Sequence, residues 1–336
     1  MVRNADESKR SRVWIVYRRR ARIFTILVIT FWWPLFARLA NAHQPPSESP
    51  LWAQLLISGS FSIIWSQFVT YSNDAEFLGR SWTGLDLFRL AVWKGASLYI
   101  PLLVVSIGTE EILSHQWLGF LWLICAGITA LIGTQRLRSA EGIKPRPVKS
   151  GELYKRTLIL SKRAGIHLRQ VCVIPPGKGH LTNAYGGGSS IAVTEDYHSW
   201  LRGPELDFVI GHELAHVKHK HGPKKLTAIA GIFGVPGVFM FSLPQVPLVW
   251  SAAIGVTATL VSLSCIYLVS RRFEYTADRD AWELIGDAEA GIRALNGLYA
   301  HNGVPPTSTW IEEVFSTHPS LSRRLLAIER GASLQE

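Results

Sequence analysis

The sequence predicts an α-helical membrane protein with about six transmembrane helices and a polar α+β domain. Three observations predict this fold class. Hydrophobic residues make up 48% of the 336 residues and charged residues only 18%, which is too apolar for a typical soluble enzyme. Leu226 to Ser270 form 45 consecutive positions without Asp, Glu, Lys, Arg or His. The regions 136–225 and 271–336 are polar and show amphipathic patterns.

The apolar run 226–270 is long enough for two spans, because one span needs about 20 apolar residues. The segment SLPQVP at 242–247 supplies the turn between them. Four further candidate spans lie at 23–41, 49–73, about 88–108 and 112–135. The third is the weakest, since Arg89 and Lys94 lie within it, and an amphipathic or re-entrant segment is the alternative there. A buried hairpin in a soluble core is the alternative for 226–270.

The distribution of Lys and Arg predicts the orientation. Residues 1–22 carry eight basic residues and 136–225 carry sixteen, whereas 41–50 and 108–116 carry none. The positive-inside rule therefore places both termini and both polar regions in the cytoplasm. The net charge of +10 is then mainly a topology signal, and we expect no nucleic-acid partner. The long basic stretch and the lack of a small-residue cleavage site predict that the first apolar run is not a cleaved signal peptide.

The three cysteines, Cys125, Cys172 and Cys265, form neither a zinc-ribbon nor a disulfide pattern. The predicted organisation in chain order is a basic cytosolic tail at 1–22, a membrane region with about four spans at 23–135, the first part of a polar domain at 145–225, a membrane hairpin at 226–270 and the second part of the polar domain at 271–336. The hairpin is thus either an insertion into one cytosolic domain or a link between two. The sequence does not indicate which oligomeric state the protein has.

Short elements are predicted at the start of the polar domain. GELYKRTLILSKRAGI at 151–166 has the apolar period of an amphipathic helix. QVCVIP at 170–175 predicts a strand. HLTNAYGGGSSIAVTED at 180–196 predicts two short strands around a triple-glycine turn.

Two longer helices follow. The segment 203–222 predicts one helix, with Pro204 in its first turn, acidic residues near its start, and Gly222-Pro223 as its stop. RRFEYTADRDAWELIG at 271–286 predicts another helix that ends at a glycine. Together these elements predict a mixed α+β domain.

The stretch GHELAHVKHKHG at 211–222 holds four of the 11 histidines. His212 and His216 are four residues apart on a helix, so their rings share one face and can converge on one cation. Glu213 lies beside them, placed to activate a metal-bound water, in the H-E-x-x-H pattern of zinc peptidases. Zinc suits two imidazoles and a carboxylate with one position left open. We interpret His219 and His221 as cations that interact with the helix C-terminus.

A third protein ligand is needed, and FEYTAD at 273–278 offers two carboxylates. Glu274 and Asp278 are again four residues apart on one helical face. Glu274 could ligate zinc while Asp278 accepts a hydrogen bond from a ligand histidine. The alternative is an ordinary charged helix face, on which these carboxylates pair with Arg271, Arg272 and Arg279.

In combination, HELAHVKHKHG, the apolar hairpin, RRFEYTADRDA and FSTHPSLSRR resemble the HtpX-like membrane zinc metalloproteases, which are related to the CaaX prenyl proteases. The resemblance covers about residues 145–330 and implies a zincin-like metalloprotease domain that binds one Zn²⁺ ion per chain. HtpX-like proteins usually have two spans before the catalytic part, whereas four are predicted here.

The resemblance also implies roles for single residues, namely zinc ligation by His212, His216 and Glu274, base catalysis by Glu213, orientation of a ligand by Asp278, and substrate binding along a strand at Asn183 and Ala184. The alternative for the last pair is an ordinary hairpin. His318 in STHPS could donate a hydrogen bond to the developing oxyanion. The alternative is a loop histidine that caps the helix beginning near Pro319.

The predicted function is a membrane-embedded zinc endopeptidase. Its expected partners are the lipid bilayer and polypeptide substrates that are membrane proteins or membrane-associated, in protein quality control. Its expected location is the bacterial cytoplasmic membrane, with the active site facing the cytoplasm. A CaaX-type prenyl-protein processing peptidase and a catalytically silent membrane scaffold are the alternatives. Intact Glu213 and Glu274 argue against the scaffold.

Overall fold

The fold was obtained as a computed structural model. It describes residues 82–101, 117–141, 144–175, 183–195, 200–225, 248–302 and 316–334, with scattered positions at 60–72, 104–108, 227–228, 306–308 and 313. The predicted tail at 1–22, the span at 23–41, most of the span at 49–73 and the hairpin turn at 242–247 lie outside the described residues. The chain divides into two compact units, one of Met1–Ile15, Ile143–Ile232 and Ser262–Glu336 and one of Val16–Gly142 and Phe233–Val261.

In the second unit, helix α3 (Gly84–Lys94) begins with a capping box. The Thr83 hydroxyl accepts a hydrogen bond from the Asp86 amide, and the Asp86 carboxylate accepts one from the Thr83 amide, so two otherwise unpaired amides are satisfied. The helix then continues as a π-helix, η1 (Gly95–Tyr99). The predicted span at 88–108 therefore changes its helical geometry at Gly95.

Helix α5 (Leu118–Ala140) covers most of the predicted fourth span, 112–135, and extends past it by five residues. Its 23 residues reach about 35 Å at a rise of about 1.5 Å per residue, which exceeds the roughly 30 Å of a bilayer core. Within the part of the chain that the structure describes, α5 is the one helix long and apolar enough to cross a membrane. Its exposed side chains include Phe120, Ile124, Ile128 and Leu131, which suits a lipid-facing surface. The total of about six spans stays a prediction.

The first unit contains a four-stranded sheet. Its strands are β1 (Arg146–Val148), β2 (Gln170–Ile174), β3 (Ala184–Gly187) and β4 (Ser190–Thr194). Their order is β1-β2-β4-β3, with β2 and β4 parallel and the other pairs antiparallel. β3 and β4 form the predicted hairpin, and its turn falls at Gly188, whose φ of 59° favours glycine. β3 lies at an edge of this sheet.

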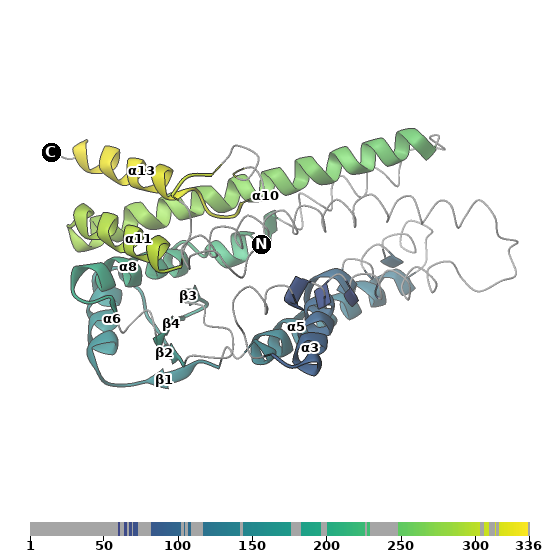
Figure 1. The fold of residues 1–336 in the computed structure, drawn as a ribbon, viewed down its shortest axis with the longest axis horizontal. Helices are drawn as coiled ribbons and strands as arrows, with labels where there is room; N and C mark the ends of the chain where they lie inside the picture. Colours follow the sequence, from purple (N-terminus) through teal and green to yellow (C-terminus); the bar gives the residue numbers. More distant parts are fainter. Residues whose placement is uncertain are drawn as a thin grey trace, which may run out of the picture. The chain divides into compact units, whose positions relative to one another are not determined.

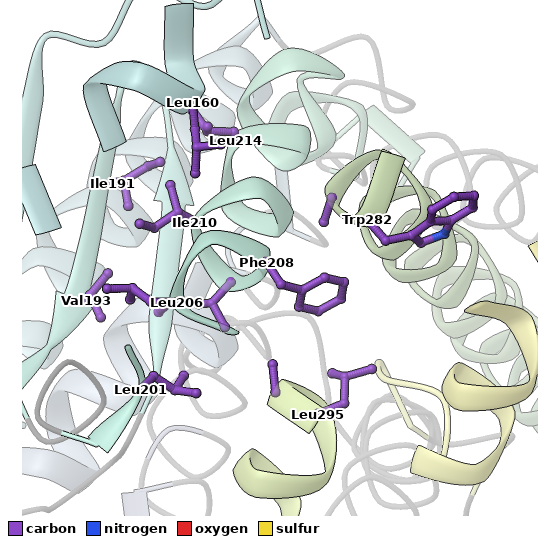
Figure 2. Packing of buried hydrophobic residues seen from close by; sticks show 14 of the residues in the cluster. Leu160, Ile191, Val193, Leu201, Leu206, Phe208, Ile210, Leu214, Trp282 and Leu295 are labelled. Atoms are coloured by element: carbon purple, nitrogen blue, oxygen red, sulfur yellow. The ribbon is translucent and has the colours of Figure 1, made fainter. Parts of the chain in front are cut away.

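Five longer helices accompany the sheet among the described residues of this unit: α6 (Glu152–Arg163), α8 (Pro204–Lys218), the C-terminal part of α10 (Leu248–Ile285), α11 (Ala288–His301) and α13 (Leu321–Ser333). α8 lies between the sheet and α11 (Figure 1). Leu206, Ile210 and Leu214 of α8 are fully buried and point toward the sheet, whereas Phe208 points away from it (Figure 2). α8 is therefore a core helix buried on more than one face.

The predicted single helix over 203–222 is wrong at its C-terminal end. α8 ends at Lys218, and His219 and Lys220 form a turn before a new helical segment over 221–225. Lys220 adopts a φ of 54°, the left-handed conformation that commonly ends a helix. Gly222-Pro223 is not the stop, since Pro223 lies in the first turn of the new segment, where a missing amide proton costs nothing.

The predicted helix at 271–286 is part of a longer one. α10 runs without a break from Leu248 to Ile285, so the second half of the predicted hairpin and the FEYTAD segment form one continuous rod. It ends at Gly286, which has a φ of 72° and satisfies the glycine stop. Gly211 of α8 packs closely on this rod, because an added Cβ there would lie 3.2 Å from the Ala281 Cα atom.

Gly133 should be required for the packing of α5 on η1. An added Cβ at Gly133 would lie 2.4 Å from the backbone carbon of Ala96, so Gly133→Ala should lower the free energy of unfolding by about 1–3 kcal/mol. Gly127→Ala in the same helix is the control, because nothing lies within 4 Å of its added Cβ. That change should be neutral or gain up to about 1 kcal/mol. Denaturant unfolding of the two detergent-purified variants measures this difference. Equal free energies of unfolding for both variants would contradict the packing.

Candidate metal centre

The H-E-x-x-H residues lie on α8, which faces α10. The His212 and His216 rings are 4.8 Å apart at an interplanar angle of 77°. Their Nε2 atoms are 3.1 Å apart. This proximity follows from the spacing of four residues, which puts both rings on one face of the helix.

Glu274 of α10 completes the cluster. Its Oε2 lies 3.7 Å from His212 Nε2 and its Oε1 lies 3.6 Å from His216 Nε2. The three candidate ligand atoms lie within 4.8 Å of one another. Tetrahedral zinc with bonds of about 2.0–2.2 Å places its ligand atoms roughly 3.3–3.5 Å apart. The separations in this cluster therefore fit one zinc ion.

The hydrogen bonds of the two rings point to a cation as well. His212 Nδ1 lies 2.9 Å from Asp278 Oδ1, and an ionised carboxylate accepts, so this nitrogen carries the proton. His216 Nδ1 lies 2.8 Å from His221 Nδ1. In the neutral form of both rings with the proton on Nδ1, both Nε2 atoms present lone pairs to each other and to Glu274. Three such acceptors without a shared proton would repel one another, and a metal ion would relieve this repulsion.

Asp278 is held by a buried arginine. Arg324 of α13 donates from Nε to Asp278 Oδ2 at 2.7 Å and from Nη2 to Oδ1 at 2.6 Å. Burial raises the pKa of Asp278, but the Arg324 charge outweighs it and holds this pKa below its usual value. Asp278 therefore stays ionised and orients the His212 ring.

Arg324 was not among the residues singled out from the sequence. The signal that could have found it is its position in α13, where it falls on the same face as Leu321 and Ile328. A charged residue on the apolar face of an amphipathic helix needs a buried partner. The sequence could not identify that partner, because Asp278 lies 46 positions away.

Glu213 is buried, with an exposed fraction of 9%. It packs on β3, where an added Cβ at Gly186 would lie 2.5 Å from the Glu213 carbonyl oxygen. Burial raises the pKa of Glu213, although a hydrogen bond with the Gly186 backbone opposes the shift. A carboxylate with a raised pKa is a better proton acceptor near neutral pH.

His318 lies at the cluster. Its Nδ1 is 2.9 Å from Glu274 Oε2, and its side chain is 61% exposed. The alternative of a helix-capping histidine is wrong, because α13 has Ser320 at its N-cap. Burial raises the pKa of Glu274, but His318, His212 and Arg324 together lower it well below its usual range.

Two connections hold the loop that carries His318. Arg271 of α10 donates to the carbonyl oxygens of Ser316, at 3.1 Å, and of Glu313. The Ser316 hydroxyl in turn donates to the His318 carbonyl oxygen at 2.7 Å. The position of His318 is therefore tied to the same helix that supplies Glu274.

The interpretation of His221 as a cation at a helix C-terminus is wrong. His221 is 5% exposed, and its ring stacks on Phe273 with centroids 4.2 Å apart. Burial lowers the pKa of His221 to about 4, so the ring is neutral at pH 7. His219 lies at the C-cap of α8, where its Nε2 is 2.6 Å from Asp280 Oδ2.

Asn183 and Ala184 lie at the start of the edge strand β3. Ala184 is buried and pairs with Val193 of β4. The Asn183 side-chain oxygen accepts a hydrogen bond from the backbone amide of Ala184 at 2.9 Å. The backbone amide of Asn183 donates to Thr194 Oγ1 at 3.0 Å. These contacts are local to the hairpin, and it is Gly186 that approaches Glu213.

Two histidines and a glutamate at these separations are the candidate ligand set of an H-E-x-x-H metallopeptidase. The sequence profile of peptidase family M48 matches residues 147–332, more than half of the chain, and the chain belongs to that family. This membership confirms the resemblance to the HtpX-like proteases that the motifs indicated.

Three relatives carry the name Protease HtpX homolog. The relative from Methanopyrus kandleri is 29% identical over 204 residues, 52% of this chain and 64% of the relative. The relative from Acaryochloris marina is 28% identical over 225 residues, 55% of this chain and 74% of the relative. That from Moorella thermoacetica is 26% identical over 292 residues, 73% of this chain and 89% of the relative. Among solved structures, the crystal structure of S. mikatae Ste24p aligns with a TM-score of 0.49 and 15% identity, covering 94% of this chain and 98% of that one.

Arg324→Met should lower the free energy of unfolding by about 3–5 kcal/mol, because it leaves the buried Asp278 carboxylate without its cation. The neighbouring Arg323 supplies a matched control. Its side chain is 64% exposed and pairs with Glu313 at 2.8 Å, so Arg323→Met should cost less than about 1 kcal/mol. Denaturant unfolding of both variants measures the difference. Equal losses would show that the Arg324–Asp278 pair is not a main support of the site.

Proposed function

We propose that the protein is a zinc-dependent endopeptidase of the bacterial cytoplasmic membrane that cleaves membrane or membrane-associated polypeptides from the cytoplasmic side, in protein quality control. One observation carries the proposal. His212, His216 and Glu274 direct three electron-pair donors at one point, at separations of 3.1 to 3.7 Å. Zinc with two imidazoles and a carboxylate keeps a position free for chemistry, which argues against a silent scaffold.

Each residue around the cluster has a proposed role. When bound, zinc would polarise a water molecule and the scissile carbonyl group. Glu213 takes the proton of the attacking water and passes it to the leaving amine, for which its raised pKa is suited. His318 donates a hydrogen bond to the developing oxyanion. Asp278 keeps the His212 ring in place for ligation.

The substrate is proposed to lie along β3 as an extended segment, at the strand that begins with Asn183 and Ala184. An edge strand offers unpaired backbone groups to an added strand. Gly186 lets this edge approach Glu213 closely, because a side chain there would collide with the Glu213 backbone. A polypeptide held in this way must be unfolded locally, which agrees with a role in removing damaged membrane proteins.

Substitution of two glutamates should separate catalysis from metal binding. Glu213→Gln should abolish cleavage of casein while zinc remains bound, because the three ligands survive and only the base is lost. Glu274→Ala should lose both zinc and cleavage, because it removes a ligand. Metal analysis and a casein assay on detergent-purified protein measure the two properties.

Asp278→Asn serves as the graded control, with a loss of about 10–100-fold in metal affinity or activity. Wild-type turnover by Glu213→Gln would remove Glu213 from its role as base. Normal zinc content in Glu274→Ala would move the third ligand to another residue. A prenylated CaaX peptide cleaved in preference to casein would replace general proteolysis by prenyl-protein processing.

Cysteine labelling in sealed cells tests the cytoplasmic placement. In a background without the native cysteines, a cysteine at Ser150 or at Ser322 should be protected from a membrane-impermeant reagent, and one at Ser47 should react. The reason is the contrast of sixteen basic residues in 136–225 with none in 41–50. Reaction at both Ser150 and Ser322 would mean an odd number of preceding spans and would place the site outside the cytoplasm.

A further inference from the structure

We propose that His221 is a positioning residue for the metal centre, one whose Nδ1 accepts a hydrogen bond from the Nδ1–H of His216 and thereby fixes the ring that presents Nε2 to the metal. The inference rests on the proposed zinc site. Its starting observation is the distance of 2.8 Å between the two Nδ1 atoms. His221 has no place in the H-E-x-x-H pattern, and the roles described above do not use it.

The direction of this hydrogen bond follows from the roles of the ring nitrogens. A neutral imidazole carries one proton, and the nitrogen that ligates a metal must present a lone pair. His216 Nε2 faces Glu274 and His212 Nε2, so the His216 proton is on Nδ1. His221 must then accept at Nδ1 and carry its own proton on Nε2. The contact thus selects one tautomer for each ring.

The two ligand histidines are supported in parallel but by different chemistry. His212 Nδ1 donates to the ionised carboxylate of Asp278 at 2.9 Å, whereas His216 Nδ1 meets a neutral imidazole. Without His221, the buried Nδ1–H of His216 would lose its partner and the ring could turn. Such supporting hydrogen bonds fix both the tautomer and the orientation of ligand histidines.

The surroundings of His221 hold its own ring in place. One face stacks on Phe273 at an interplanar angle of 6°, and the ring also stacks with His219 with centroids 5.3 Å apart. Phe273 directly precedes the ligand Glu274 on α10. The same packing therefore connects the His221 ring to the helix that supplies the third ligand.

The backbone turn at Lys220 makes the contact possible. On a continuous helix, a residue five positions after His216 would point about 140° away from it. The chain instead leaves α8 after Lys218, and Lys220 adopts a φ of 54°, the only positive φ at a non-glycine residue in the described part of the chain. A strained residue of this kind persists only where its surroundings hold it. Here the turn at Lys220 brings the His221 ring to Nδ1 of His216, the ring nitrogen that faces away from Glu274.

The test compares variants of His221 that differ in the acceptor. His221→Phe keeps an aromatic ring for the stack on Phe273 but removes the acceptor. His221→Asn places a side-chain oxygen near the position of Nδ1. His219→Phe is the matched control, because its ring keeps the stack on His221, and His219 itself pairs with Asp280 and not with a ligand. Competition with a chelator gives the zinc dissociation constant of each detergent-purified full-length protein, and the melting temperature of the metal-free protein reports folding.

We expect His221→Phe to weaken zinc binding by about 10–100-fold, His221→Asn to recover most of this loss, and His219→Phe to bind zinc as the wild type does. Should His221→Phe not fold, His221→Leu takes its place against His221→Asn. Unchanged zinc affinity in the variant without an acceptor would overturn the inference. Equal losses in the Asn and Phe variants would also overturn it, since they would indicate packing alone. A wild-type protein that binds no zinc would instead overturn the proposed function itself.

Discussion

A chain of buried hydrogen bonds from Arg324 through Asp278 to His212 joins three helices that are distant in the sequence. Asp278 is 1% exposed and Arg324 is 5% exposed, so neither charge has access to water. Each is tolerable in the interior only because the other is present. The orientation of the His212 ring, and with it the whole cluster, depends on this pair.

The charges around the cluster balance over several residues. Two buried carboxylates, Glu274 and Asp278, face one buried guanidinium, with Arg324 Nη1 3.9 Å from Glu274 Oε2 and in bidentate contact with Asp278. His216 is neutral at pH 7, because burial lowers its pKa to about 3. The cluster therefore combines the ionised carboxylate of Glu274 with the neutral imidazole of His216. A bound metal ion would supply the missing positive charge.

The same elements that build the cluster also enclose Glu213, the proposed base. Glu213 points into the space between α8 and β3, where the absence of a side chain at Gly186 lets the strand approach. Among the described strands β3 pairs with β4, so β3 forms an edge of this sheet. The hydrophobic core of α8 with β4 and α11 keeps the helix in register with this edge, since Leu206, Ile210 and Leu214 are fully buried.

The sequence by itself determined the local features of this protein. The spacing of four residues placed His212 with His216, and apolar periodicity located α6, β2 and the β3–β4 hairpin. These features depend on the period with which side chains change direction along one helix or one strand. Residues close together in the sequence are enough to determine that period. The membrane orientation stays a prediction, which rests on the distribution of Lys and Arg among the loops.

Only the tertiary structure decided which distant residues meet. The sequence left open whether Glu274 ligates a metal and Asp278 orients a histidine, or whether both belong to an ordinary charged face. Packing of α10 against α8 brought Glu274 to both Nε2 atoms and Asp278 to His212. Periodicity predicted a helix through His221, but the left-handed turn at Lys220 redirected that ring. Arg324 acquires its partner only when α13 packs on α10. The physical reason is that helical periodicity determines which face of a helix a side chain occupies. Which other element packs against that face depends on long-range tertiary contacts.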